Sequence, residues 1–181
     1  MRLGEDGGRP QASAAVLNLF NLTRQDIMLN ESLLAGNCRA LQTTARLIVP
    51  SKKIDLIALN GAYGRTLAFG PGHVESSLLP SSVSTTILTG HRDTHFRFLK
   101  ELTREDELVI QTASGNELRY LVAERRIVDS RSGTITLDPS QTRLVLVTCY
   151  PFDAMMPGGP LRYMVVAEES WRHKAQASRA S

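Results

Sequence analysis

The most constraining feature of this sequence is an apolar run that ends abruptly in a cysteine and a proline. Residues 144–148 read LVLVT, and Cys149, Tyr150 and Pro151 follow directly. A continuous Val- and Leu-rich run of this length predicts a buried β-strand. Proline cannot donate a backbone N–H to a central ladder, so we expect the strand to end before Pro151. Cys149 is therefore predicted at the mouth of a sheet, where a thiol can meet a substrate.

The middle of the chain predicts many strands and little helix. The expected strands are residues 47–50, 54–59, 84–89, 107–111, 118–128, 135–137, 143–148 and 161–168. A further apolar run at residues 66–69 precedes residues 70–73 (GPGH), which predict a loop. Helical spacing of apolar residues near 96–102 fits one or two turns of helix. About eight short, regularly spaced strands favour an all-β barrel or sandwich over an alternating α/β fold.

The two ends of the chain differ from its middle in their pattern of apolar and polar residues. Apolar residues at helical spacing in residues 14–34, such as Val16 and Ile27, predict a short amphipathic helix or two. The polar residues after Glu169 predict a helical or frayed tail. We therefore divide the chain into an N-terminal extension at 1–43, a barrel domain at 44–170 and a polar tail at 171–181.

Composition narrows the class of protein. A chain of 181 residues that is 42% hydrophobic can bury a core without disulfide staples. The net charge is +3, and Lys and Arg are scattered, so no nucleic-acid partner is predicted. Two cysteines, Cys38 and Cys149, allow one disulfide but no disulfide scaffold. With no apolar stretch of about eighteen residues and no signal-peptide core, the protein is either cytosolic or lacks its targeting part in this chain.

Three side chains with complementary chemistry lie at the ends of expected strands. His91 follows residues 84–89, Cys149 ends the run described above, and Arg162 begins the last strand. If these strands are neighbours, the three side chains meet at one rim. A nearby histidine or arginine favours the reactive thiolate of a cysteine. His91 can then exchange protons with leaving and entering groups, and Arg162 can donate hydrogen bonds to an oxyanion.

The motifs around these positions resemble the sortase family. They are TGHRDT at 89–94, LVTCYPF at 146–152 and GGPLRY at 158–163, in the order and at about the spacing of that family. GPGH at 70–73 also resembles the loop before the catalytic histidine in several sortase classes. The stretches HRDTHFRFL and CYPFD are most similar to the proteobacterial branch called class GN. Leu146 is a departure, because many sortases carry threonine at this packing position.

This resemblance implies an eight-stranded β-barrel that acts as a cysteine transpeptidase. By motif position, Cys149 is the nucleophile, His91 the general acid/base, and Arg162 the group that holds the oxyanion and positions the substrate. The family cleaves an LPXTG-like sorting signal after its threonine and passes the acyl group from the thioacyl enzyme to an amine. The implied partners are a protein that carries a sorting signal and an amine acceptor, with no metal and no organic cofactor.

The resemblance also implies a place in the cell envelope. The family is anchored in the inner membrane and faces the periplasm. No anchor or signal peptide is visible in this sequence, so membrane association is expected only through a segment that the chain does not contain.

Four further residues are weaker candidates for substrate binding: His73, Asp93, Thr148 and Tyr150. His73 either lines a substrate groove or caps the Gly-Pro-Gly turn. Asp93 can orient His91, but we favour a role in capping the short helix that follows or in shaping the loop. Thr148 and Tyr150 flank the expected nucleophile.

The same residues could also belong to a zinc site, another class of cysteine protease or a protein with a different function. His91 and His95 have the i, i+4 spacing of a zinc-protease helix, but Arg92 occupies the place of the required glutamate, so we expect no zinc. The papain-like and caspase signatures are absent, as is a phosphate-binding loop. Two alternatives remain open: a non-catalytic barrel that binds an extended peptide by strand addition, and a thiol hydrolase that uses water instead of an amine.

Overall fold

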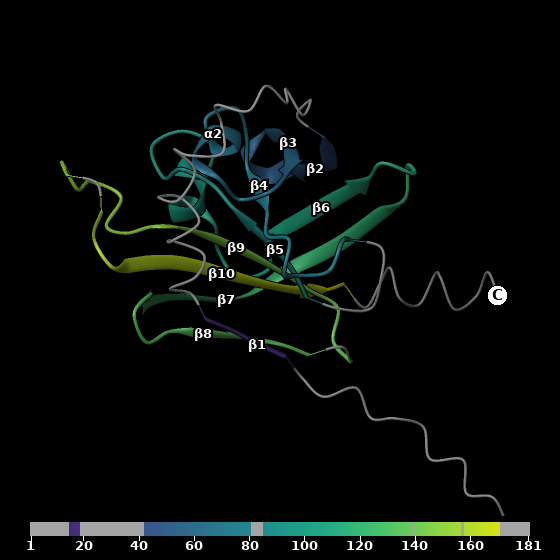
Figure 1. Ribbon diagram of the computed structural model, residues 1–181. Helices are drawn as coiled ribbons and strands as arrows, with labels where there is room; N and C mark the ends of the chain where they lie inside the picture. Colours follow the sequence, from purple (N-terminus) through teal and green to yellow (C-terminus); the bar gives the residue numbers. More distant parts are fainter. Residues whose placement is uncertain (1–14, 19–41, 81–84, 139, 157, 171–181) are drawn as a thin grey trace, which may run out of the picture.

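The protein is a closed β-barrel with a small separate sheet beside it (Figure 1). The computed structural model describes residues 15–18, 42–80, 85–138, 140–156 and 158–170. The strands are β1 (Ala15–Asn18), β2 (Thr43–Val49), β3 (Ile54–Asn60), β4 (Gly72–His73), β5 (Thr85–Thr89), β6 (Glu107–Thr112), β7 (Glu117–Asp129), β8 (Thr134–Leu137), β9 (Arg143–Cys149) and β10 (Leu161–Glu169). The short helices are η2 (Pro50–Lys52), α2 (Gly64–Leu67) and η3 (Arg97–Glu101).

The barrel closes in the strand order β10-β7-β6-β2-β3-β4-β5-β9, with β9 also paired to β10. The prediction of an all-β, eight-stranded barrel with short helices is therefore confirmed. Among the described segments, no helix has the length and apolar character needed to cross a membrane.

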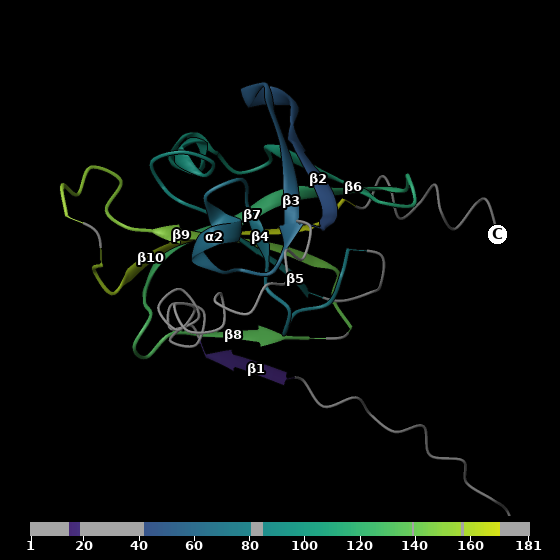
Figure 2. The same ribbon diagram turned by 45° about the horizontal axis from the view of Figure 1, so that its top comes forward.

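The membership of the barrel differs from the sequence prediction at two strands. Residues 70–73, expected as a loop, contain β4, which pairs with the end of β3 on one side and the end of β5 on the other. The expected strand at 135–137 forms β8, which pairs with β1 outside the barrel. Figure 2 shows β1 and β8 as a pair set apart from the barrel strands. Two residues suffice for β4 because neighbouring strands supply its backbone partners on both sides.

Two predicted elements have a different local structure. The helix expected from residue 14 onward is wrong for Ala15–Asn18, which pair as a strand with Thr134–Leu137. Backbone pairing across the fold outweighs a weak local helical pattern. The apolar run at 66–69 contributes to α2 and the turn after it. The rest of the predicted N-terminal helix, Cys38 and the tail at 171–181 lie outside the described residues.

The strand β9 is buried on both of its faces. Leu144 and Leu146 belong to the main apolar core, whereas Val145 and Val147 belong to a second apolar cluster that contains Ile135 of β8. Successive side chains of a strand point to opposite faces, so the two sets face different clusters. This double burial explains why the sequence of β9 is continuously apolar instead of alternating.

His73 is a buried histidine in the barrel wall. Its side chain is 3% exposed, and Nε2 lies 3.2 Å from the carbonyl oxygen of Leu78. Ser77 Oγ also lies 3.2 Å from this nitrogen, whereas Nδ1 is buried without a hydrogen-bond partner. Burial lowers the pKa of His73 below its usual value, against the opposing effect of the Leu78 carbonyl. The imidazole is therefore held in its neutral form.

We predict that His73 makes the fold sensitive to acid. Its pKa is lower in the folded state than in the unfolded state, where it is about 6.5, so below that pH the unfolded state binds more protons. The free energy of unfolding therefore falls as the pH drops. Urea unfolding at neutral and mildly acidic pH measures this, and His73→Gln should flatten the fall by up to about 1 kcal/mol per pH unit.

Thr86→Val is the matched control, because it removes another bond to the Leu78 carbonyl without removing a titratable group. This variant should lower stability by a similar amount at both pH values. The same pH dependence in wild type and His73→Gln would contradict the prediction.

Candidate active site

The strands β5 and β9 bring His91 and Cys149 to the same rim of the barrel. The two strands are parallel, and Thr89 lies opposite Val147. His91 and Cys149 each lie two residues beyond this pair. Because parallel strands end at a common edge of the sheet, both residues leave the ladder at the same level. His91 is exposed and Cys149 is partly exposed, so both are open to a ligand.

Two hydrogen bonds fix the segment before His91 against the end of β9. The N–H of Gly90 donates to the carbonyl of Val147 at 3.2 Å, and Thr148 Oγ1 donates to the carbonyl of Gly90 at 2.7 Å. Thr148 is only 2% exposed, so it lies beneath the site rather than on its surface. A Cβ atom at Gly90 would lie 3.0 Å from the ring of Phe96, so this close approach favours glycine.

Arg162 lies directly opposite Cys149 in the antiparallel pairing of β9 with β10. Side chains of directly opposed residues start about 5 Å apart at Cβ. Arg162 Nη1 donates to the carbonyls of Gly159 at 2.6 Å and Leu161 at 2.8 Å. These bonds hold the Nη1 end of the guanidinium beside the loop before β10. The register therefore brings together Cys149 and Arg162, and the parallel pairing of β5 adds His91.

Aromatic rings pack together just beyond Cys149. The rings of Tyr150 and Tyr163 are stacked, with centroids 6.2 Å apart and planes inclined by 21°. Phe152 meets Tyr163 edge-on at 5.1 Å. Since Tyr163 follows Arg162, these contacts pack the loop after Cys149 against β10.

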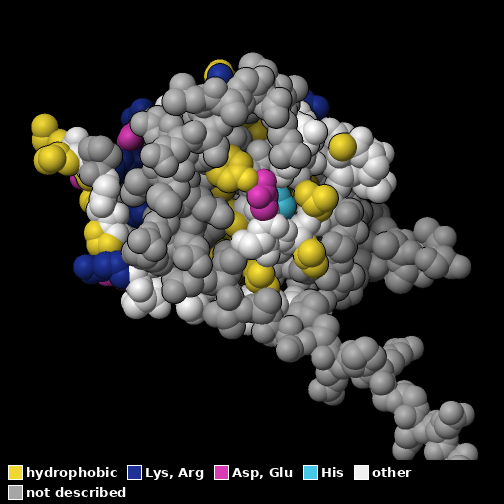
Figure 3. Space-filling view, viewed as in Figure 1, with side chains coloured by type: hydrophobic (Ala, Val, Ile, Leu, Met, Phe, Trp, Pro, Cys, Tyr) yellow, Lys and Arg dark blue, Asp and Glu magenta, His cyan; other side chains and the backbone are white. Residues whose placement is uncertain are grey.

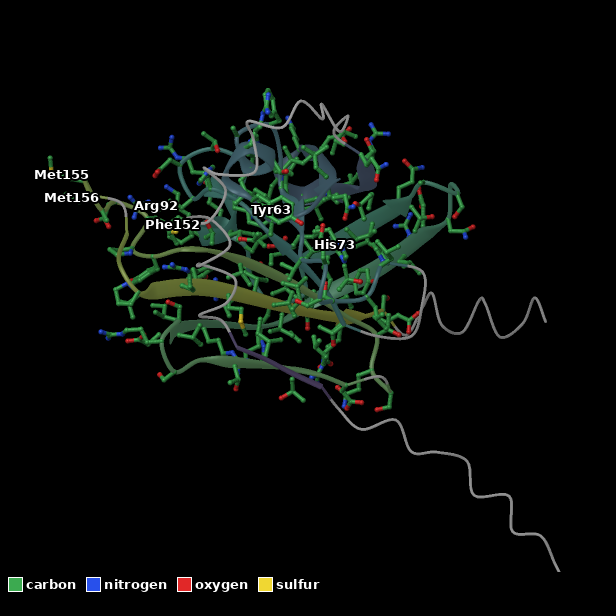
Figure 4. All side chains as sticks on the ribbon, in the orientation of Figure 1. Tyr63, His73, Arg92, Phe152, Met155 and Met156 are labelled. Atoms are coloured by element: carbon green, nitrogen blue, oxygen red, sulfur yellow. The ribbon has the colours of Figure 1, made fainter. Side chains whose placement is uncertain are left out.

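Arg92 is the residue of this site that the sequence did not reveal. It is 8% exposed, and its Nη1 and Nη2 donate to the carbonyls of Pro151 and Ala154, each at 2.6 Å. Figure 4 shows Arg92 beside Phe152, at the end of the barrel from which the loop with Met155 and Met156 projects. The one sequence signal was its place directly after His91, because the two carbonyls it binds lie far away in the sequence.

The placement of Asp93 settles part of its predicted role. Its carboxylate lies 3.2 Å from Arg92 Nε. The residue at the N-cap of η3 is Phe96, and no side chain makes a capping hydrogen bond there. The capping role is therefore wrong, and Asp93 belongs to the loop through Arg92.

The described residues form neither a metal site nor, on the face shown in Figure 3, a basic stripe. Over the described ranges, no group of three or more His, Cys, Asp and Glu side chains is arranged to hold a metal ion. On the face shown in Figure 3, the visible Lys and Arg side chains lie in small groups at the periphery rather than in one basic stripe. Cys149 is a free thiol among the described residues.

Sequence comparison finds a matching family model and a similar known protein. The family model of the sortase domain matches residues 47–170. The chain is also 34% identical, over 125 residues, to Sortase D of Bacillus subtilis (strain 168). That alignment covers 68% of this chain and 62% of the relative, so the chain spans about three fifths of the length of Sortase D.

Solved structures share the barrel. Sortase A from Corynebacterium diphtheriae has a TM-score of 0.65 and 24% identity, over 72% of this chain and 62% of that one. Sortase C-1 from Actinomyces oris has a TM-score of 0.60 and 26% identity, over 70% of this chain and 71% of that one. The first of these likenesses shows the fold alone. The family model, however, covers more than half of the chain and includes His91, Cys149 and Arg162, so this chain belongs to the sortase family.

Proposed function

We propose that this protein cleaves an LPXTG-like sorting signal through a thioacyl enzyme and transfers the acyl group to an amine. Sortases are cysteine transpeptidases of the cell envelope, and their substrates are proteins with sorting signals and amine acceptors. The observation that carries the proposal is the register that sets Arg162 opposite Cys149, with His91 leaving the neighbouring strand at the same level.

In the first half of the proposed reaction, the Cys149 thiolate attacks the carbonyl carbon of the threonine in the signal. Electrons move to the carbonyl oxygen, and Arg162, from the strand position opposite Cys149, donates hydrogen bonds that stabilise the oxyanion. The C–N bond then breaks, and His91 gives a proton to the leaving amine. The acyl group remains as a thioester on Cys149.

In the second half, an acceptor amine attacks the thioester carbonyl. His91 takes a proton from the attacking nitrogen, and the oxyanion again forms beside Arg162. Collapse of this intermediate releases the Cys149 thiolate and leaves a new amide bond. Water in place of the amine gives hydrolysis through the same steps.

The weaker candidates receive different roles in this proposal. Tyr150 is partly exposed and stacked on Tyr163, which supports a role in the wall of the substrate site. Thr148 and His73 are almost fully buried, which supports roles in holding the strands in place rather than in substrate contact. Asp93 is 68% exposed at its side chain and remains a candidate for contact with substrate.

We further propose that the protein belongs to the proteobacterial class GN branch and faces the periplasm. The support is the similarity of HRDTHFRFL and CYPFD to that branch.

A panel of sorting-signal peptides that vary around the Leu-Pro core tests the substrate preference. Equal reaction with every peptide in the panel would count against a defined sorting signal.

The nucleophile is tested by mass spectrometry of the protein incubated with sorting-signal peptides. Wild type should gain the mass of the acyl fragment on Cys149, and Cys149→Ala should gain none because no thioester can form. Cys149→Ala should keep the thermal unfolding temperature of wild type within a few degrees, which controls for loss of fold.

The same experiment separates the alternatives when an amine is added in excess. A transfer product supports transpeptidation, whereas hydrolysed peptide alone would favour the hydrolase. Peptide binding without any adduct would favour the non-catalytic barrel.

The role of Arg162 is tested by Arg162→Ala. Loss of a preorganised oxyanion donor lowers the rate of thioester formation by roughly a hundredfold to a thousandfold, with a smaller change in KM. Arg143→Lys is the matched control, because Arg143 pairs with Glu168 at the opposite end of the same two strands. It should keep the rate within about twofold. An unchanged rate in Arg162→Ala would remove Arg162 from the mechanism.

A further inference from the structure

Arg92 is a buried cation for which the reaction scheme has no use. Removing a guanidinium from water costs several kcal/mol unless its N–H groups find partners. The carbonyls of Pro151 and Ala154 supply two, each at 2.6 Å. The third partner is the Asp93 carboxylate, 3.2 Å from Arg92 Nε on a side chain that is 68% exposed. The two carbonyls thus satisfy both terminal nitrogens of the buried guanidinium.

These two bonds join the segment of the base to the segment of the nucleophile. Arg92 directly follows His91, and Pro151 lies two residues beyond Cys149. The bonded residues are separated by 59 and 62 positions in the sequence, so this side chain links two otherwise distant loops. The bonds between Gly90 and the end of β9 lie on the other side of His91. The His91 segment is thus tied to the Cys149 segment both before and after the histidine.

The loop that Arg92 holds is also fixed against β10. The carbonyls of Pro151 and Ala154 flank Phe152, whose ring packs edge-on against Tyr163. Arg92, which follows β5, therefore binds the backbone of this loop. Tyr163, in β10, packs against a side chain of the same loop. Without the Arg92 bonds, the loop at residues 151–154 would lose its attachment on the β5 side and keep only its packing against β10.

We propose that Arg92 is a positioning residue that sets the distance between His91 and Cys149 by holding the loop at residues 151–154. The positioning role rests on the proposed function only in taking Cys149 as the nucleophile and His91 as the acid/base. The planar guanidinium presents two nitrogen donors to two carbonyls three residues apart. A lysine ammonium is a compact charge and does not reproduce that geometry. A displacement of about 1 Å at a reacting pair can lower a rate by about a hundredfold.

The test compares Arg92→Lys, which keeps the charge, with wild type and with Arg104→Lys. Arg104 is the control, because its Nε donates to the carbonyl of Ala123 at 3.0 Å on the exposed surface. Ala123 lies in β7, which pairs with β10 and β6 rather than with β5 or β9. Three quantities are measured on each protein at a temperature where all are folded: the pH profile of Cys149 alkylation by iodoacetamide, kcat for peptide transfer, and KM.

Arg92→Lys should lower kcat by roughly tenfold to a hundredfold, with a change in KM of less than about threefold. Its alkylation profile should move along the pH axis, because a changed distance between the imidazole and the thiol changes how strongly the thiolate is favoured. Arg104→Lys should match wild type in all three quantities within about twofold. If Arg92→Lys does not fold, Arg92→Gln, which retains an amide donor, takes its place with the same readouts.

An unchanged alkylation profile together with a kcat within about twofold of wild type would overturn the proposal. A loss of kcat that only follows the unfolded fraction would also overturn it, because that is what a purely structural residue would show. Alkylation requires no sorting signal. A shifted profile in the absence of any transfer product would therefore support the positioning role of Arg92 and reject the proposed transpeptidase activity.

Discussion

The geometry of the candidate active site depends on the pairing of β9 with a strand on each side. On one side β9 runs parallel to β5, and on the other it runs antiparallel to β10. Both of its faces are buried in apolar clusters, so a shift by one residue would place Val and Leu side chains in the wrong cluster. The register that protects this core is the same register that sets Cys149 opposite Arg162. Stability and the geometry of the site are thus decided by one set of contacts.

Hydrogen bonds from polar side chains fix the loops that follow the paired ends of β5 and β9. Beyond the last paired residues the backbone has no strand partner, and its direction must be fixed by other bonds. Thr148 supplies one from beneath the site, through the carbonyl of Gly90, and Arg92 supplies two from beside it, to the loop after Cys149. Each of these donors is nearly inaccessible to water, so an unmade bond would leave a buried polar group without a partner. That penalty keeps the loops in a single arrangement.

The barrel also shows how burial assigns opposite tasks to the same residue type. His73 is enclosed in β4, where loss of water favours its neutral form and its ring serves as a hydrogen-bonding part of the wall. His91 is exposed to solvent just beyond the end of the neighbouring strand β5. The two arginines near Cys149 differ in burial. Arg92 is 8% exposed, whereas Arg162 is partly exposed at the rim opposite Cys149. Both donate hydrogen bonds to backbone carbonyls.

Local sequence patterns were enough to predict the strand character of the chain, the point at which β9 ends, and His91, Cys149 and Arg162 as candidate site residues within family motifs. Those features depend on local chemistry: apolar patterning, the missing N–H of Pro151, and residue types at short spacing. The folded chain was needed to show that β4 joins the barrel, that Ala15–Asn18 pair with β8, and that Arg92 binds a loop about sixty residues away. Each of these depends on which distant backbone groups lie within hydrogen-bonding distance, and that information arises only when the barrel closes.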